Sequence, residues 1–189
     1  MSKVITFFNK KGGTGKTSLS YSVAKDLDYP LLSNDDSVIE EIYPNKAKIL
    51  DELELIEHNV VYDLGGFIDK GIKEIFKASN IIVVPTTLDI NSIKRTLNTV
   101  VEIKEYCNNI VIVINRVQKN KISKYRESIE ALKSLKKDII YIRESEAITN
   151  SIHLAKTITE LCNVSNFTKN QYKGIYEDYT NLLNLIKGV

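Results

Sequence analysis

The chain has 189 residues, of which 43% are apolar, and a formal net charge of +2. This length and apolar content fit one globular domain with its own core, so we expect residues 1–189 to form a single domain. The small net charge gives no argument for a polyanionic partner, and no apolar run approaches the ~18 residues that a membrane span needs.

The charge is unevenly distributed along the chain. The segment from Ile90 to Arg143 holds 12 basic and 5 acidic residues, a weak indication of an anionic surface partner. The two cysteines, Cys107 and Cys162, are far apart and lack the spacing of a metal site. Together with an N-terminus too short for a signal peptide, they favour a reducing cytoplasm.

The apolar pattern alternates between short continuous runs and helical spacing. The expected strands cover 4–8, 58–66, 80–87, 109–116 and 138–145. The expected helices begin at Lys16 and cover 70–79, 90–106 and 121–135, with further helical segments up to the C-terminus.

Continuous apolar strands that alternate with helices predict an α/β fold with a mostly parallel sheet covered by helices on both faces. Ligands of such sheets bind beyond the carboxyl ends of the strands. Four candidate motifs follow expected strands, at residues 9–17, 63–66, 85–89 and 115–116. We therefore expect them to meet at one edge of the sheet.

The segment 8–18, "FNKKGGTGKTS", has most features of a phosphate-binding loop. The pattern G-x-x-x-x-G-K-[ST] fits except that Lys10 occupies the first glycine position. The glycines let main-chain N–H groups turn toward phosphate oxygens, and the following helix adds its positive end. Lys16 is predicted to reach the β- and γ-phosphates, and the Thr17 hydroxyl to ligate Mg²⁺. The predicted nucleotide contacts are Lys11, Gly12, Gly13, Thr14, Gly15, Lys16, Thr17 and Ser18.

"KGGTGKT" resembles the deviant Walker A motif, K-G-G-x-G-K-[ST], of the ParA/MinD superfamily of ATPases. The resemblance implies a P-loop NTPase fold and a homodimer that encloses two ATP molecules. In such a dimer Lys11 would reach the phosphates bound by the other protomer and take part in catalysis with Lys16. We interpret Lys10 as a solvated lysine.

"VVYDLGG" (60–66) resembles the second acidic motif of the same superfamily. The resemblance implies that Asp63 binds Mg²⁺ through water and that the Gly66 N–H senses the γ-phosphate. Family members more often have proline after this aspartate, so the glycines here leave the geometry of the switch open.

The family also has a strand that ends in D-x-D-P-Q, in which the later aspartate positions the attacking water. An ungapped alignment on Leu31 and Leu32 places Asn34 at the first aspartate and Asp36 at the second. We assign the catalytic carboxylate to Asp36, with Asp35 as the alternative. "SNDD" also fits a simple turn and helix cap.

Two further segments carry weaker resemblances. "INR" (114–116) lies where the family reads adenine, which implies base contacts from Asn115 and Arg116, although an asparagine can also simply end a strand. "IRESEA" resembles an R-x-S-E-A segment of chromosomal ParA proteins, which makes Arg143 a candidate DNA-phosphate contact. Lys121 and Lys124 are further candidates, because non-specific DNA binding needs scattered basic side chains on one face.

The resemblance as a whole implies a ParA-type partition ATPase that uses ATP and Mg²⁺. Its expected partners are a second copy of the chain, non-specific DNA and a ParB-like protein, in a nucleoid-associated cytoplasmic location. The alternative is a MinD-like positioning ATPase at a membrane. The last helix argues against it, since Glu177 and Asp178 offset its lysine and its apolar spacing is typical of core packing.

Overall fold

The computed structural model describes residues 2–66 and 71–189; of Lys119 and Lys121, only the backbone is described. The strands are β1 (Val4–Phe8), β2 (Leu31–Ser33), β3 (Ala47–Ile49), β4 (Val60–Leu64), β5 (Ile81–Thr86), β6 (Ile110–Val117) and β7 (Asp138–Arg143). The helices are α1 (Lys16–Leu27), α2 (Ile39–Ile42), α3 (Ile72–Ala78), α4 (Ile90–Ile103), α5 (Arg126–Lys133), α6 (Glu146–His153), α7 (Ile158–Cys162), α8 (Asn166–Gln171) and α9 (Lys173–Lys187), with a 3₁₀ segment η1 (Lys119–Tyr125).

The seven strands form one sheet in the order β3-β2-β4-β1-β5-β6-β7, and every described pairing is parallel. β1 lies at the centre and pairs with β4 on one side and β5 on the other. After β4 the chain crosses to the far side of β1. This is the position in a doubly wound sheet where a crevice opens beyond the carboxyl ends of the strands.

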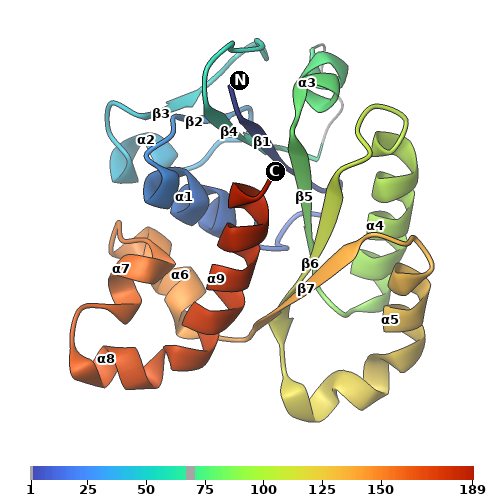
Figure 1. The fold of residues 1–189 in the computed structure, drawn as a ribbon, viewed down its shortest axis with the longest axis vertical. Helices are drawn as coiled ribbons and strands as arrows, with labels where there is room; N and C mark the ends of the chain where they lie inside the picture. Colours follow the sequence, from blue (N-terminus) through green and yellow to red (C-terminus); the bar gives the residue numbers. More distant parts are fainter. Residues whose placement is uncertain (1, 67–70) are drawn as a thin grey trace.

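Helices cover both faces of the sheet. Figure 1 shows α1 and α6 to α9 on one side, and α3, α4 and α5 on the other. β1 contributes alternately to both cores, with Ile5 and Phe7 in the first and Val4 and Phe8 in the second. Both faces of β1 are therefore buried from solvent, which explains its continuous apolar sequence.

The expected α/β fold is confirmed, and the differences are local. The sequence pattern did not indicate β3 and α2, which are only three and four residues long. The helix expected at 121–135 is divided into η1 and α5. The segment 67–70, which includes the first residue of the helix expected at 70–79, lies outside the described residues.

Candidate functional site

A cavity of about 1140 Å³ opens beside the loop that follows β1. Five of its described lining side chains are cationic and one is a carboxylate. The lining consists of Lys10, Lys11, Gly12, Lys16, Asp35, Gly66, Asn91, Lys94, Arg95 and Asn98. A concave site with this excess of positive charge is suited to a polyanion. The loop, the segment after β2, the segment after β4 and α4 meet here, as expected of motifs at the carboxyl edge of the sheet.

The backbone of the loop has the shape of an anion-binding turn. Gly13 and Gly15 have positive φ angles of 74° and 90°, and Gly15 is the N-terminal cap of α1. Lys16, the first residue of α1, is only 7% exposed. A Cβ atom at Gly15 would collide with the side chain of Asn115, so a larger residue does not fit there. The main-chain N–H groups at the start of α1 are thus available to phosphate oxygens.

Asn9 fixes the start of the loop, a role that the sequence analysis missed. Its Nδ2 donates to the Pro85 carbonyl at 2.8 Å and to Thr96 Oγ1 at 2.9 Å. Its Oδ1 accepts from the Lys11 N–H at 3.0 Å. Asn9 is fully buried, and this network connects the loop to β5 and α4. A fully satisfied buried amide of this kind holds the backbone in one arrangement.

The two additional lysines of the loop differ in their surroundings. Lys10 forms an ion pair with Glu102 of α4, so the interpretation of Lys10 as a solvated lysine is wrong. Lys11 lines the cavity and lies near Asp89, the N-terminal cap of α4. Partial burial raises the pKa of Asp89, but hydrogen bonds from Ser92 and Thr87 and the charge of Lys11 outweigh it and lower the pKa to about 2. The positive charges of Lys10 and Lys11 are therefore partly compensated by the carboxylates of Glu102 and Asp89, which belong to α4 and its N-terminal cap.

Asp63, at the end of β4, is a buried carboxylate whose two oxygens accept no hydrogen bond from the described residues. Burial raises its pKa from 3.8 to about 6; the Thr17 hydroxyl and Lys16 oppose the rise, and Asp35 adds to it. The Thr17 and Ser20 hydroxyls lie near enough to lower this pKa, yet neither makes a hydrogen bond of ordinary geometry with Asp63, and the Ser20 hydroxyl donates instead to the Thr17 carbonyl at 3.1 Å. An unpaired buried carboxylate costs free energy unless a cation compensates it.

This donor set fits Mg²⁺. The ion prefers hard oxygen ligands and is usually held by one or two protein oxygens, waters and substrate phosphates. Asp63 and Thr17 supply a carboxylate and a hydroxyl beside Lys16. The two residues assigned to the metal from the sequence are therefore near each other, and Asp63 lacks the partner that Mg²⁺ would provide.

The segment after β2 approaches the segment after β4. Asn34 Oδ1 accepts the Gly65 N–H at 2.8 Å, and the Asp35 N–H donates to Ser33 Oγ at 3.0 Å. Both Asp35 and Asp36 are exposed, but only Asp35 is among the described residues that line the cavity. The position of Asp36 does not support its assignment as the catalytic carboxylate, and the alternative, Asp35, is better placed.

Gly66 approaches the loop closely. A Cβ atom at this position would come within 2.9 Å of the Lys10 main-chain oxygen, nearer than real Cβ contacts allow. The glycine therefore permits the segment after β4 to contact the phosphate loop directly. This contact is compatible with the predicted role of Gly66 in sensing the γ-phosphate.

The Asn115 side chain is hydrogen-bonded to the main chain of the phosphate loop. Its Nδ2 donates to the Thr14 carbonyl at 3.0 Å, its Oδ1 accepts from the Arg116 N–H at 2.9 Å, and it is 1% exposed. With its amide used in this way, Asn115 is a loop-supporting residue here, and this arrangement does not support an adenine contact. Arg116 is exposed with a φ angle of 56°, at an irregularity in the pairing of β6 with β7.

Arg143 is not a free surface cation. Its Nε and Nη2 donate to the two carboxylate oxygens of Asp178 at 2.7 and 2.9 Å, and its main-chain N–H donates to the same carboxylate. The guanidinium also packs against Gly174. Arg143 thus joins β7 to α9. Its assignment as a DNA contact is corrected, because its guanidinium, which would bind a DNA phosphate, already forms an ion pair with Asp178.

The other two DNA candidates lie around η1. Lys124 is exposed and lies over the ring of Tyr125, 5.9 Å from its centroid. The side chain of Lys121 lies outside the described residues. Lys124 therefore remains available as a phosphate contact.

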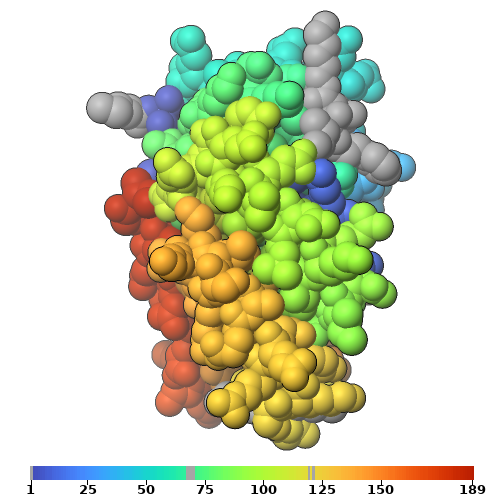
Figure 2. Space-filling view, turned by 90° about the vertical axis from the view of Figure 1, so that its right-hand side faces the viewer, coloured from blue at the N-terminus to red at the C-terminus, as the bar shows by residue number. Residues whose placement is uncertain are grey.

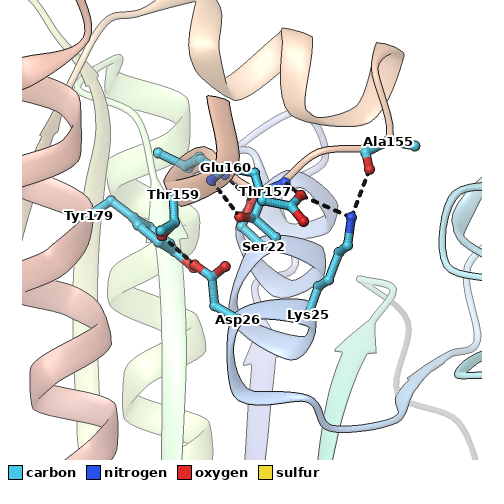
Figure 3. Close-up of polar contacts among 9 residues, drawn as sticks. Ser22, Lys25, Asp26, Ala155, Thr157, Thr159, Glu160 and Tyr179 are labelled. Atoms are coloured by element: carbon cyan, nitrogen blue, oxygen red, sulfur yellow. Dashed lines mark hydrogen bonds and ion pairs between the residues drawn. The ribbon is translucent and has the colours of Figure 1, made fainter. Parts of the chain in front are cut away.

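The helix that follows the loop is anchored to the C-terminal helices. Figure 3 shows Asp26 of α1 accepting hydrogen bonds from Tyr179 of α9 at 2.9 Å and from Thr159 of α7 at 2.6 Å. Lys25 pairs with Glu160 at 2.9 Å. Burial, together with Asp26, raises the pKa of Tyr179 well above its ordinary value. Any movement of α1 on ligand binding would therefore have to change these hydrogen bonds and this ion pair.

Comparison with known proteins identifies solved structures that share this fold. No protein-family model matches the sequence, and no curated protein matches it. Solved structures, however, match over nearly the whole chain. An ATP complex of a McdA variant from Cyanothece has a TM-score of 0.69 at 11% identity, covering 100% of this chain and 97% of that one.

Two further matches are of similar quality. MinD from Aquifex aeolicus has a TM-score of 0.64 at 14% identity, covering 97% of this chain and 98% of that one. A plasmid partition protein from Borrelia burgdorferi bound to AMPPNP has a TM-score of 0.65 at 17% identity, with coverages of 96% and 99%. The chain therefore has the fold of ParA/MinD ATPases, which confirms the resemblance noted in the sequence at the level of fold.

Proposed function

We propose that this protein is a ParA-type partition ATPase that binds Mg-ATP in the cavity beside the loop. The buried Asp63 carboxylate, which has no hydrogen-bond partner among the described residues and lies next to Thr17 and Lys16, carries this proposal, because burying such a group is costly without a cation to bind. Structures of two proteins with this fold contain ATP or AMPPNP. A P-loop NTPase with a magnesium site accounts for the loop, the carboxylate and the basic cavity together.

The chemistry that fits is hydrolysis of the γ-phosphate. Bound Mg²⁺ would neutralise negative charge on the β- and γ-oxygens. Asp35 orients a water molecule, whose oxygen forms the new bond to the γ-phosphorus while the bond to the oxygen of ADP breaks. Lys16 and the N–H groups of the loop stabilise charge on the phosphate oxygens.

The second part of the proposal is a nucleotide-dependent homodimer. Lys11 carries it, because this lysine matches the position in the deviant Walker A motif that acts on the other protomer. In the structure Lys11 lines the cavity without an ion pair among the described residues. A phosphate from a second copy would compensate its charge.

The third part is non-specific DNA binding in a nucleoid-associated, cytoplasmic setting, with release stimulated by a ParB-like partner. Lys124, Arg126 and Lys136 are exposed on η1 and around α5. Scattered cations of this kind contact phosphates without reading sequence. A dimer would present two copies of the surface, so ATP-dependent dimerisation would raise DNA affinity through multivalency.

A MinD-like role at a membrane is the alternative, and α9 argues against it. Its apolar residues Ile175, Tyr179, Leu182 and Ile186 are buried in the domain core, which leaves no apolar face for a lipid surface. Among residues 2–66 and 71–189, no helix has the length and apolarity needed to cross a bilayer.

Fluorescence anisotropy with a labelled duplex tests the proposal. We expect salt-sensitive DNA binding with Mg-ATP, much weaker binding with ADP or without nucleotide, and loss of the ATP effect in Lys16→Ala. Lys169→Ala, a substitution of an exposed lysine on α8, is the matched control and should behave as wild type. Equal DNA affinity with and without ATP would contradict the proposal.

A further inference from the structure

One face of α4 is built of polar and basic side chains that line the cavity. The residues are Asn91, Lys94, Arg95 and Asn98, at the spacing i, i+3, i+4, i+7 that places four side chains on one side of a helix. All four are exposed, whereas Ile93, Thr96 and Val100 on the opposite side are buried. In Figure 2 the green surface of α4 lies beside the blue surface of the N-terminal part of the chain. None of these residues belongs to the nucleotide-binding motifs recognised in the sequence.

The two cations of this face, Lys94 and Arg95, have no charged partner among the residues that the structure describes. Lys10 is paired with Glu102, and Lys11 lies near Asp89. Lys94 and Arg95 form no ion pair and no side-chain hydrogen bond with any other described residue. Lys94, Arg95 and Lys16 line the same cavity, so an anion that enters it is attracted by all three charges.

The location indicates which anion. The same cavity is lined by Asp35 and Gly66, the residues placed at the γ-phosphate end of the proposed nucleotide. The α4 face therefore lies at the terminal-phosphate end. Lys94 and Arg95 line a recess that is continuous with the phosphate loop.

We infer that Lys94 and Arg95 form a second cationic contact for the terminal phosphate of a nucleoside triphosphate held by the loop. The planar guanidinium of Arg95 can bind two phosphate oxygens at once, and Lys94 adds a point charge. The contact favours a triphosphate over a diphosphate, because only the triphosphate carries the group that reaches α4. This inference rests on the proposed nucleotide binding and identifies residues that make the site selective for the triphosphate.

The test compares a double variant with a charge-matched control. Lys94→Gln/Arg95→Gln removes both cations from the cavity. Lys104→Gln/Lys169→Gln removes two exposed lysines elsewhere, one of them at the C-terminal end of α4. Titration calorimetry measures the Mg²⁺ complexes of AMPPNP and ADP, and thermal melting checks that each variant folds.

We expect the double variant to bind AMPPNP roughly tenfold more weakly, a change of about 1.4 kcal/mol, and ADP less than about twofold more weakly. The control should match wild type for both ligands. An unchanged AMPPNP affinity, or equal losses for AMPPNP and ADP, would overturn the inference while leaving the proposed function intact. Loss of DNA binding at unchanged AMPPNP affinity would also overturn it and assign the face to nucleic acid. If the wild type binds neither nucleotide, the proposed function fails as well.

Discussion

Replacement of Asp63 by asparagine should stabilise the protein in the absence of nucleotide. Asp63 is 1% exposed, and its oxygens have no hydrogen-bond partner among the described residues. The rise in its pKa from 3.8 to about 6 corresponds to up to about 3 kcal/mol of folding free energy lost when the carboxylate is ionised. Asp63→Asn keeps the shape of the side chain and removes the buried charge.

The effect has a defined pH dependence. Well below pH 3.8 the carboxyl is protonated in both folded and unfolded protein, so its ionisation costs nothing. Between pH 4 and 6 the unfolded state ionises before the folded state, and stability falls. Above pH 6 the full cost applies. The stability difference between Asp63→Asn and wild type that arises from this ionisation should therefore be only about 0.5 kcal/mol at pH 4 and reach up to about 3 kcal/mol at pH 7.5.

Urea denaturation followed by circular dichroism at both pH values measures this difference. Saturating Mg-ATP should reverse the order, because bound ligand stabilises the wild type, whereas the variant lacks the metal-binding carboxylate. If Asp63→Asn is less stable than wild type at pH 7.5 without nucleotide, or if the difference does not change with pH, the reasoning is refuted.

The remaining predictions concern three other contacts. Gly66→Ala should abolish ATP-dependent dimerisation while ADP binding persists, because the added Cβ atom would come within 2.9 Å of a main-chain oxygen of the loop. Sedimentation velocity measures the dimerisation, and calorimetry measures the ADP binding. Asp178→Asn should lower the free energy of unfolding by about 1–2 kcal/mol in urea titrations, because it breaks the bidentate pair with Arg143. Asp35→Asn should slow phosphate release by tenfold or more with little change in ATP affinity, and Asp36→Asn should leave the rate near wild type. The reverse result for the two aspartates would restore the assignment made from sequence.

The sheet and the loop were predictable because their signals are local. Buried parallel strands are continuous apolar runs, and the glycine-lysine loop with its following helix has a pattern that few other structures share. β3 and η1 were not predictable in this way. β3 is three residues long and only partly buried, so no apolar run indicates it. η1 has apolar spacing like that of a helix, and the pattern does not distinguish 3₁₀ from α in so short a segment.

The errors at the site concern contacts between residues far apart in the chain. Lys10 meets Glu102, and Arg143 meets Asp178, pairs that become neighbours only after the helices pack on the sheet. The choice between Asp35 and Asp36 depends on the turn in which the Asp35 N–H donates to Ser33 Oγ. An ungapped sequence alignment carries no information on this turn. The sequence analysis predicted the helix at 90–106 but not the position of its polar face beside the loop, because that position depends on how the helix packs on the sheet.

The most direct test of the account is the association state with and without nucleotide. Sedimentation velocity should show a dimer with Mg-ATP and a monomer with ADP for the wild type. Lys11→Ala should remain monomeric with Mg-ATP while still binding the nucleotide. If the wild type stays monomeric at saturating Mg-ATP, or if Lys11→Ala dimerises as well as wild type, the central claim that two copies share the bound triphosphates is contradicted.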